Sequence, residues 1–416
     1  MAQVDGEQRA VLKGDGSLVP PPANDSALPG YLCLYIALYL AYGTESAYFP
    51  AFLQNHGLTI EQIGLVLAAG TIVRIMAGPA TGRLADYLEA RKQVLSVASC
   101  LSGLIGFAYN LAFGFAPLLA VSMAHAAATA SLAPLSDALS VTASVQGRSF
   151  QYGWVRGAGS AAFVCGTLLS GQLIDRFGLS SIIIASSVLF LVMALSAMRI
   201  RSHVETPSLP EKLEMGGFSA LWKIVAYRRL IVIAFLVIGS HALNDTFAVI
   251  QWREAGYSNL SISLMWSEAV IAEVAVFFLL GPRLIASLGL TGAATLSASA
   301  GVLRWSVMAS MTAVPALVGA QALHGLTFAL MHLAAMGIVA RSIPDRLAAT
   351  AQTVYGTGAL GIASATMTFA SGYLYGLFGL QAFWAMAASC ALALLVLRGS
   401  VGVFHSCQPR TSTCAS

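Results

Sequence analysis

The sequence predicts an all-α membrane protein with twelve transmembrane helices in two six-helix, pseudo-symmetric halves. The first observation is composition, because 57% of the 416 residues are hydrophobic and only 10% are charged, whereas soluble domains carry about 25% charged residues. The second is a mean hydropathy of +0.76, with apolar stretches that repeatedly reach the ~20 residues a helix needs to cross a bilayer. The third is an internal similarity between the two halves.

Twelve apolar stretches separated by short polar breaks define the expected helices. An even number of spans places both termini on one side of the membrane. The expected spans are 31–53, 60–82, 93–113, 117–142, 151–174, 180–198, 230–252, 260–280, 290–311, 315–340, 347–375 and 381–398.

A longer polar stretch rich in charge and proline divides these spans into two groups of six. The first residues lack the apolar core of a signal peptide and indicate a flexible tail. Six cysteines without a CxxC pair suggest no disulfide framework and no metal site. The expected parts are a cytoplasmic tail over 1–30, an N-terminal bundle over 31–198, a cytoplasmic linker over 199–229, a C-terminal bundle over 230–398 and a cytoplasmic tail over 399–416.

Basic residues predict the orientation. With cytoplasmic termini, seventeen of the 22 lysines and arginines lie on the cytoplasmic side, and only Arg176 and Arg253 lie on the opposite side. Lysine and arginine concentrate in cytoplasmic loops. We therefore expect a multi-pass protein of the inner membrane with both termini in the cytoplasm. The other three basic residues, Arg74, Arg156 and Arg304, lie within spans.

The two halves align with each other at nearly constant offsets. A shift of 199 places "GLTIEQIG" (57–64) over "GYSNLSIS" (256–263), and a shift of 201 places "SGQLIDRFG" (170–178) over "SGYLYGLFG" (371–379). Parallel repeats of this kind are typical of transporters that bind substrate near the midplane, between the halves.

The stretch "GRLADYLEARK" (82–92) resembles the signature loop of the major facilitator superfamily. Two positions depart from that pattern, because Tyr87 replaces a basic residue and Glu89 replaces a glycine. The loop is interpreted as a conformational latch between helix ends, and an ordinary positive-inside loop is the alternative. The matching residues are Gly82, Asp86, Arg91 and Lys92.

Charged side chains inside the spans are the main candidates for function, because each costs ~2.5–3.5 kcal/mol on insertion and therefore faces a partner or a water-filled cavity. Five acids outnumber three arginines, and an acid without a permanent partner can carry a coupled proton. Arg74 and Glu273 are equivalent under the 199-residue shift, so a structural ion pair between them is an alternative. The set is Glu45, Arg74, Asp137, Arg156, Asp245, Glu268, Glu273 and Arg304, with His241, His324 and His332 as titratable companions.

A succession of segments resembles the phenylpropionate permease family of the major facilitator superfamily (MFS_1-like) over about residues 31–398. The resemblance implies the major facilitator fold and a proton-driven inner-membrane permease, with 3-phenylpropionate as the substrate of the namesake. The segments are "APLSDALS" (133–140), "YGWVRGAGSAAF" (152–163), "GSHALNDTF" (239–247), "GYSNLSISLMWSEAVIAEV" (256–274), "LRWSVM" (303–308) and "QALHGLTFALMHLAAM" (321–336).

The same segments are similar, more distantly, to the lactose permease family. That similarity implies a substrate-binding arginine at Arg156, with a carboxylate next to the position of Asp137. It also implies functional roles for Glu268, Arg304 and His324. Thr327 stands where that family releases its proton from a glutamate, so the expected proton carriers are Glu268, Glu273 or Asp245.

The sequence therefore predicts a secondary active transporter that imports a small organic molecule with protons. For an aromatic carboxylate, Arg156 would pair with the carboxyl group, and its alternative is snorkelling to the lipid headgroups. For a sugar, Asp137 and Arg156 would bind hydroxyl groups. Aromatic walls are expected from Tyr152, Trp154, Phe247 and Trp266, although packing or lipid contact is the alternative for each.

Other functional classes are alternatives to a proton-coupled importer. Efflux through the same fold and a transporter-like membrane sensor remain alternatives. No nucleotide-binding glycine loop followed by Lys and Ser or Thr occurs, which argues against an ATP-driven pump. We expect no enzyme activity, no cofactor, no metal and no nucleic-acid partner. The expected partners are the substrate, protons and the bilayer, and the expected state is a monomer.

Overall fold

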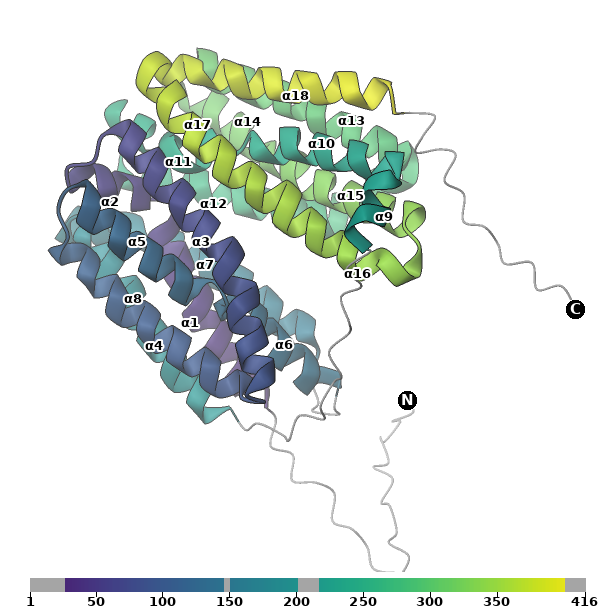
Figure 1. Ribbon diagram of the computed structural model, residues 1–416. Helices are drawn as coiled ribbons and strands as arrows, with labels where there is room; N and C mark the ends of the chain where they lie inside the picture. The colour runs from purple at the N-terminus through teal and green to yellow at the C-terminus, as the bar shows by residue number, and fades with distance from the viewer. Residues whose placement is uncertain (1–26, 146–149, 201–216, 401–416) are drawn as a thin grey trace, which may run out of the picture.

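The computed structural model describes residues 27–145, 150–200 and 217–400, and these residues form helices without strands (Figure 1). Most of the predicted tails and the middle of the predicted linker lie outside the described residues, so the predicted domain boundaries stay a prediction. The helices of the N-terminal half are α1 (Leu28–Ser46), α2 (Phe49–Asn55), α3 (Ile60–Tyr87), α4 (Arg91–Ala108), η1 (Tyr109–Leu111), α5 (Phe115–Thr129), α6 (Leu132–Val145), α7 (Tyr152–Phe177) and α8 (Ser180–Arg199).

The C-terminal half contains three short π-helical segments, η2, η3 and η4, within or between its α-helices. Its elements are α9 (Gly217–Lys223), α10 (Val225–Gly239), α11 (Ala242–Glu254), α12 (Asn259–Ala275), η2 (Val276–Leu280), α13 (Gly281–Ser310), α14 (Val314–Ala322), η3 (Leu326–Leu330), α15 (Met331–Ser342), α16 (Asp345–Val354), η4 (Tyr355–Ile362), α17 (Ala363–Phe378), η5 (Gly379–Ala382) and α18 (Phe383–Arg398).

Nine segments of the described chain are long and apolar enough to cross a membrane. The segment Asn259–Ser310 turns at Gly289, whose φ of 70° ends one helix and begins the next. The segment Arg346–Arg398 turns in the same way at Gly379, whose φ is 55°. Both backbone conformations favour glycine. With each of these two segments read as two passes, and with α1 and α2 as another, helices can be assigned to all twelve predicted spans.

The 199-residue offset reappears in how two equivalent helices begin. The Thr59 hydroxyl accepts a hydrogen bond from the Gln62 amide at the start of α3, at 3.4 Å. The Ser258 hydroxyl accepts one from the Ser261 amide at the start of α12, at 3.2 Å. Side-chain oxygens at these positions satisfy amides that have no partner inside the helix, so both repeats start their helix with the same device.

Two equivalent helix crossings join the halves. A Cβ added at Gly171 of α7 would lie 2.6 Å from Ser263 Oγ of α12, and a Cβ added at Gly64 of α3 would lie 2.9 Å from the Gly372 Cα of α17. Such contacts exclude any larger side chain, so small residues let the backbones approach. Ser263 follows Gly64 by 199 residues and Gly372 follows Gly171 by 201, so the repeat offsets relate one crossing to the other.

Hydrogen bonds join the two halves on the side of the molecule away from Leu28 and Arg398, the outer ends of the first and last helices. The Tyr48 hydroxyl donates to the Asn259 carbonyl at 2.6 Å and contacts the Ser263 hydroxyl at 3.0 Å. Asn259 Nδ2 donates to Asp175 Oδ1 at 2.7 Å. An apolar core around Phe52 and Trp252 draws on both halves here. Figure 1 shows the halves converging near α2 and α11 and lying apart at α6 and α16.

Candidate functional site

Two adjoining cavities lie between the halves. The first, of about 480 Å³, is lined mainly by the N-terminal half, and the second, of about 510 Å³, mainly by the C-terminal half. Ser46, Phe163 and Asp245 line both, so the cavities meet at these residues. Volumes of this size suit a small organic ligand.

The first cavity contains a charged cluster from three different helices. Glu45 of α1 faces His125 of α5, with 4.0 Å between Glu45 Oε1 and His125 Nδ1. Arg74 of α3 lines the same cavity and interacts electrostatically with Tyr42 and His125. Within the described chain Arg74 makes no hydrogen bond and no ion pair. Its guanidinium donors are therefore free to bind a ligand.

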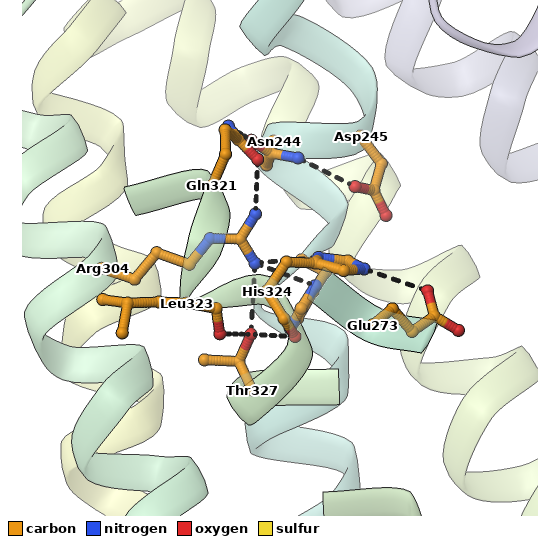
Figure 2. A network of polar contacts seen from close by, with 9 residues as sticks. Asn244, Asp245, Glu273, Arg304, Gln321, Leu323, His324 and Thr327 are labelled. Atoms are coloured by element: carbon orange, nitrogen blue, oxygen red, sulfur yellow. Dashed lines mark hydrogen bonds and ion pairs between the residues drawn. The ribbon is translucent and has the colours of Figure 1, made fainter. Parts of the chain in front are cut away.

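The second cavity is backed by Arg304 of α13, whose side chain is fully buried. Its Nη1 donates to His324 Nδ1 at 3.1 Å and to Thr327 Oγ1 at 3.2 Å, and its Nη2 donates to Gln321 Oε1 at 3.0 Å (Figure 2). Its guanidinium carbon also lies 4.3 Å from the centre of the Trp305 ring. This buried cation is thus held by neutral acceptors and a π face, as a charge away from water requires.

The Arg304 contact indicates the tautomer of a neutral His324. A guanidinium only donates hydrogen bonds, so His324 Nδ1 must accept and the neutral ring carries its proton on Nε2. His324 Nε2 lies 3.4 Å from Glu273 Oε2, on the wall of the second cavity. Arg304, His324 and Glu273 therefore form a connected chain that ends in a cavity carboxylate.

A second branch connects Arg304 to the other cavity acid. Gln321 Nε2 donates to Asn244 Oδ1 at 3.2 Å, and Asn244 Nδ2 donates to Asp245 Oδ1 at 3.1 Å. Figure 2 shows Asp245 and Glu273 at the ends of two different branches of this network. A change in charge at either acid can therefore be transmitted to the same buried arginine.

The expected pair of Asp137 and Arg156 is not formed in the described structure. Asp137 Oδ1 instead accepts hydrogen bonds from the hydroxyls of Tyr35 at 2.5 Å and Tyr152 at 2.9 Å. The Arg156 guanidinium lies 4.7 Å from the centre of the Tyr39 ring. Neither Asp137 nor Arg156 lines either cavity. Tyrosines of α1 and α7 contact these two charged side chains in place of the predicted pairing between them.

The predicted aromatic walls divide between surface, core and cavity. Trp154 is 68% exposed and lies outside both cavities. Phe247 is fully buried and stacks on Tyr375 with ring centres 4.9 Å apart, so it belongs to the core. Trp266 does line the second cavity. Helical periodicity alone does not say which of these faces is packed.

The remaining predicted residues fall in three places. Glu268 lines neither cavity, whereas Glu273, five residues later on α12, lines the second. The alternative ion pair between Arg74 and Glu273 is not seen, since Glu273 faces His324. In the signature loop, Arg91 Nε bonds to Asp86 Oδ1 at 2.8 Å. Gly82 has no neighbour within 4 Å of an added Cβ, so it leaves open space at this loop.

Sequence reasoning missed His125 and undervalued Glu45 and Arg74. All three lie within expected spans, so a complete count of titratable groups in the spans would have included His125. Only the packing of α1, α3 and α5 brings them to one cavity. No group of three or more potential metal ligands occurs in the described part of the chain.

Membrane-spanning helices around cavities lined by charged groups from both halves are typical of membrane transporters of small molecules. The chain belongs to the MFS_1-like family, which it matches over residues 30–386. It is a multi-pass membrane protein and a secondary transporter of the major facilitator type.

Among its relatives, the probable 3-phenylpropionic acid transporter of Escherichia coli (strain K12) is 33% identical over 368 residues, covering 88% of this chain and 96% of the relative. The maltose permease of Geobacillus stearothermophilus is 26% identical over 342 residues, covering 82% and 86%. The crystal structure of the nucleoside transporter NupG has a TM-score of 0.80 at 15% identity, over 91% of this chain and 99% of that one. That last likeness concerns the fold alone.

Proposed function

We propose that this protein is a proton-coupled symporter that imports a small aromatic carboxylate by alternating access. The observation that carries the proposal is the pair of adjoining cavities, which brings Glu45, Arg74 and His125 of one half close to Asp245 and Glu273 of the other. A site made by both halves changes its exposure when the halves move against each other.

The orientation follows from the basic residues. With both termini in the cytoplasm of a cell with an inner membrane, the bonds of Tyr48 and Asn259 lie at the opposite face. In this orientation the contacts that join the halves close the outer side of the cavities.

The residues that line the cavities and the similarity to a named relative support the substrate class. Tyr42, Phe49 and Tyr109 provide aromatic walls in the first cavity, and Trp266 and Phe328 provide them in the second. The relative with 33% identity is named as a probable 3-phenylpropionic acid transporter. An aromatic ring with a carboxylate suits a cavity that combines these walls with an unpaired arginine.

Glu273 is the proposed carrier of the proton. His324 Nδ1 accepts from Arg304 and His324 Nε2 faces Glu273, so a proton added to Glu273 removes the negative charge at the end of the chain that leads to the buried cation. Glu273 can hold the proton at the cavity wall, 3.4 Å from His324 Nε2. Asp245 is the second candidate, because it lines both cavities.

The test is uptake into proteoliposomes that contain the purified full-length protein. Radiolabelled 3-phenylpropionate should accumulate when the outside is acidic, and a protonophore should abolish the accumulation. Maltose, lactose and uridine serve as competitors and as alternative labelled substrates. Uptake of a sugar or nucleoside in place of the acid, or accumulation that ignores the proton gradient, would contradict the proposal.

A further inference from the structure

Of the three arginines within the spans, only Arg74 lines a cavity without a partner in the described chain. Arg304 is enclosed by its own hydrogen bonds, and Arg156 lies over Tyr39 outside both cavities. A guanidinium presents a planar fork of donors that matches a carboxylate. Arg74 keeps this fork unused in the wall of the first cavity.

Two further hydrogen-bonding side chains lie in the same wall. Ser122 of α5 is 5% exposed, and its hydroxyl lies near the Tyr109 side chain without a well-formed hydrogen bond. It lines the first cavity together with His125, one turn further along the helix. A hydroxyl that is only weakly bonded inside the protein can bond to a ligand atom in the cavity, so Ser122 and His125 add polar groups to the wall that contains Arg74.

The acids of this cavity limit the charge of the ligand. Glu45 and Asp245 both line it. One carboxylate on the ligand can pair with Arg74, but a second would face these acids and be repelled. The ring faces of Phe49 and Tyr109, whose centres are 5.1 Å apart, leave an aromatic wall for the rest of the molecule. The lining thus favours an aromatic monocarboxylate.

We infer that Arg74, with Ser122 and His125, forms the subsite that binds the carboxylate of the substrate, in place of Arg156. This inference rests on the proposed function, because it names the residues that would hold the proposed substrate. It makes Arg74 a specificity-determining residue that distinguishes an acid from its neutral analogue. The geometry assigns this role to α3, where the sequence favoured α7.

The experiment measures binding to the purified full-length protein in detergent, without any proton gradient. Labelled 3-phenylpropionate is displaced by unlabelled 3-phenylpropionate, by its neutral amide and by phenylsuccinate. The wild type should prefer the monoacid. Arg74→Gln should weaken acid binding about 10- to 100-fold, the range of one charge-assisted hydrogen bond or two, and leave amide binding within about 2-fold of the wild type. Arg74→Lys should fall between, because it keeps the charge and loses the fork.

Arg156→Gln is the matched comparison, since it removes the same charge from the neighbouring candidate. It should keep the preference for acid over amide. Ligand should also protect Arg74 of the wild type from phenylglyoxal, as read by mass spectrometry, while the amide should not, and this readout needs no variant to fold. Retained acid preference in Arg74→Gln, or its loss in Arg156→Gln alone, would overturn the subsite and leave the proposed function standing. A wild type that binds no aromatic acid would overturn both.

Discussion

The two halves of the site place an arginine of a spanning helix in opposite environments. Arg304 in the C-terminal half is fully enclosed, and its donors meet His324, Thr327 and Gln321 at 3.0 to 3.2 Å. Arg74 in the N-terminal half is exposed to a cavity and has no partner in the described structure. Arg304 is therefore part of an internal hydrogen-bond network, whereas the donors of Arg74 are available to a ligand.

This difference separates two functions that the sequence presents together. A hydrogen-bonded network connects the proton-carrier candidates Glu273 and Asp245 to the buried Arg304, in which Nη1 and Nη2 are bonded. In the first cavity, the donors of Arg74 have no partner in the described structure and can bond to a negatively charged ligand. We therefore expect changes in the C-terminal network to affect stability and coupling, and changes around Arg74 to affect binding.

The largest effect should come from removing the enclosed guanidinium. Arg304→Met is expected to lower the free energy of unfolding by roughly 3 kcal/mol, because buried acceptors on His324 and Gln321 lose their donor at ~1 to 3 kcal/mol each. Arg74→Met, the matched change, should stay within about 0.5 kcal/mol of the wild type. Denaturant unfolding of the purified variants in one detergent measures both. Equal losses in the two variants would remove the contrast between the arginines.

Proton coupling should depend on Glu273 of α12 and not on Glu268 of the same helix. Glu273→Gln keeps the shape of the side chain but cannot carry a proton, so proton-driven accumulation should be lost while exchange of labelled for unlabelled substrate continues. Glu268→Gln should behave as the wild type, because Glu268 lines neither cavity. Accumulation and exchange assays in the same proteoliposomes distinguish the two steps. Loss of accumulation in Glu268→Gln alone would move the proton to that residue.

The fold could be predicted from the sequence because a bilayer leaves few choices. Backbone groups in hydrocarbon must be paired internally, so apolar stretches of sufficient length become helices. The repeat offset was visible as well, and it returns in the caps at Thr59 and Ser258 and in the crossings at Gly64 and Gly171. The turn at Gly289, inside a predicted interhelical break, fits the same logic.

The candidate site was only partly predictable, because charge in a span shows that a residue matters without showing its partner. Arg304, His324 and Glu273 were named separately as candidates, and only the structure shows them in contact, whereas Asp137 and Arg156 contact tyrosines instead of each other. Whether Arg74 has a partner depends on how α1, α3 and α5 pack. That packing carries no local signal in the sequence.

A smaller change should measure what one acceptor of Arg304 contributes to the C-terminal network. Thr327→Val keeps the size of the side chain and removes one acceptor of Arg304, at 3.2 Å. We expect a loss of about 1 kcal/mol in the free energy of unfolding, the usual contribution of one hydrogen bond. The same denaturant assay measures it. An unchanged stability would show that the threonine hydroxyl is dispensable and that the network has spare capacity.

The smallest effect separates two buried serines, one in each half. Ser297 Oγ of α13 donates to the Leu326 carbonyl at 2.7 Å, whereas the hydroxyl of Ser122 makes no well-formed hydrogen bond and lies near the Tyr109 side chain. Ser297→Ala should therefore cost about 1 kcal/mol in the free energy of unfolding, and Ser122→Ala should cost less, because only a weak interaction is lost. Ser122→Ala should still weaken binding of the aromatic acid by several fold, about one neutral hydrogen bond. A clear loss of stability in Ser122→Ala would mean that the N-terminal cavity satisfies its own polar groups, and Arg74 would then no longer stand apart from Arg304.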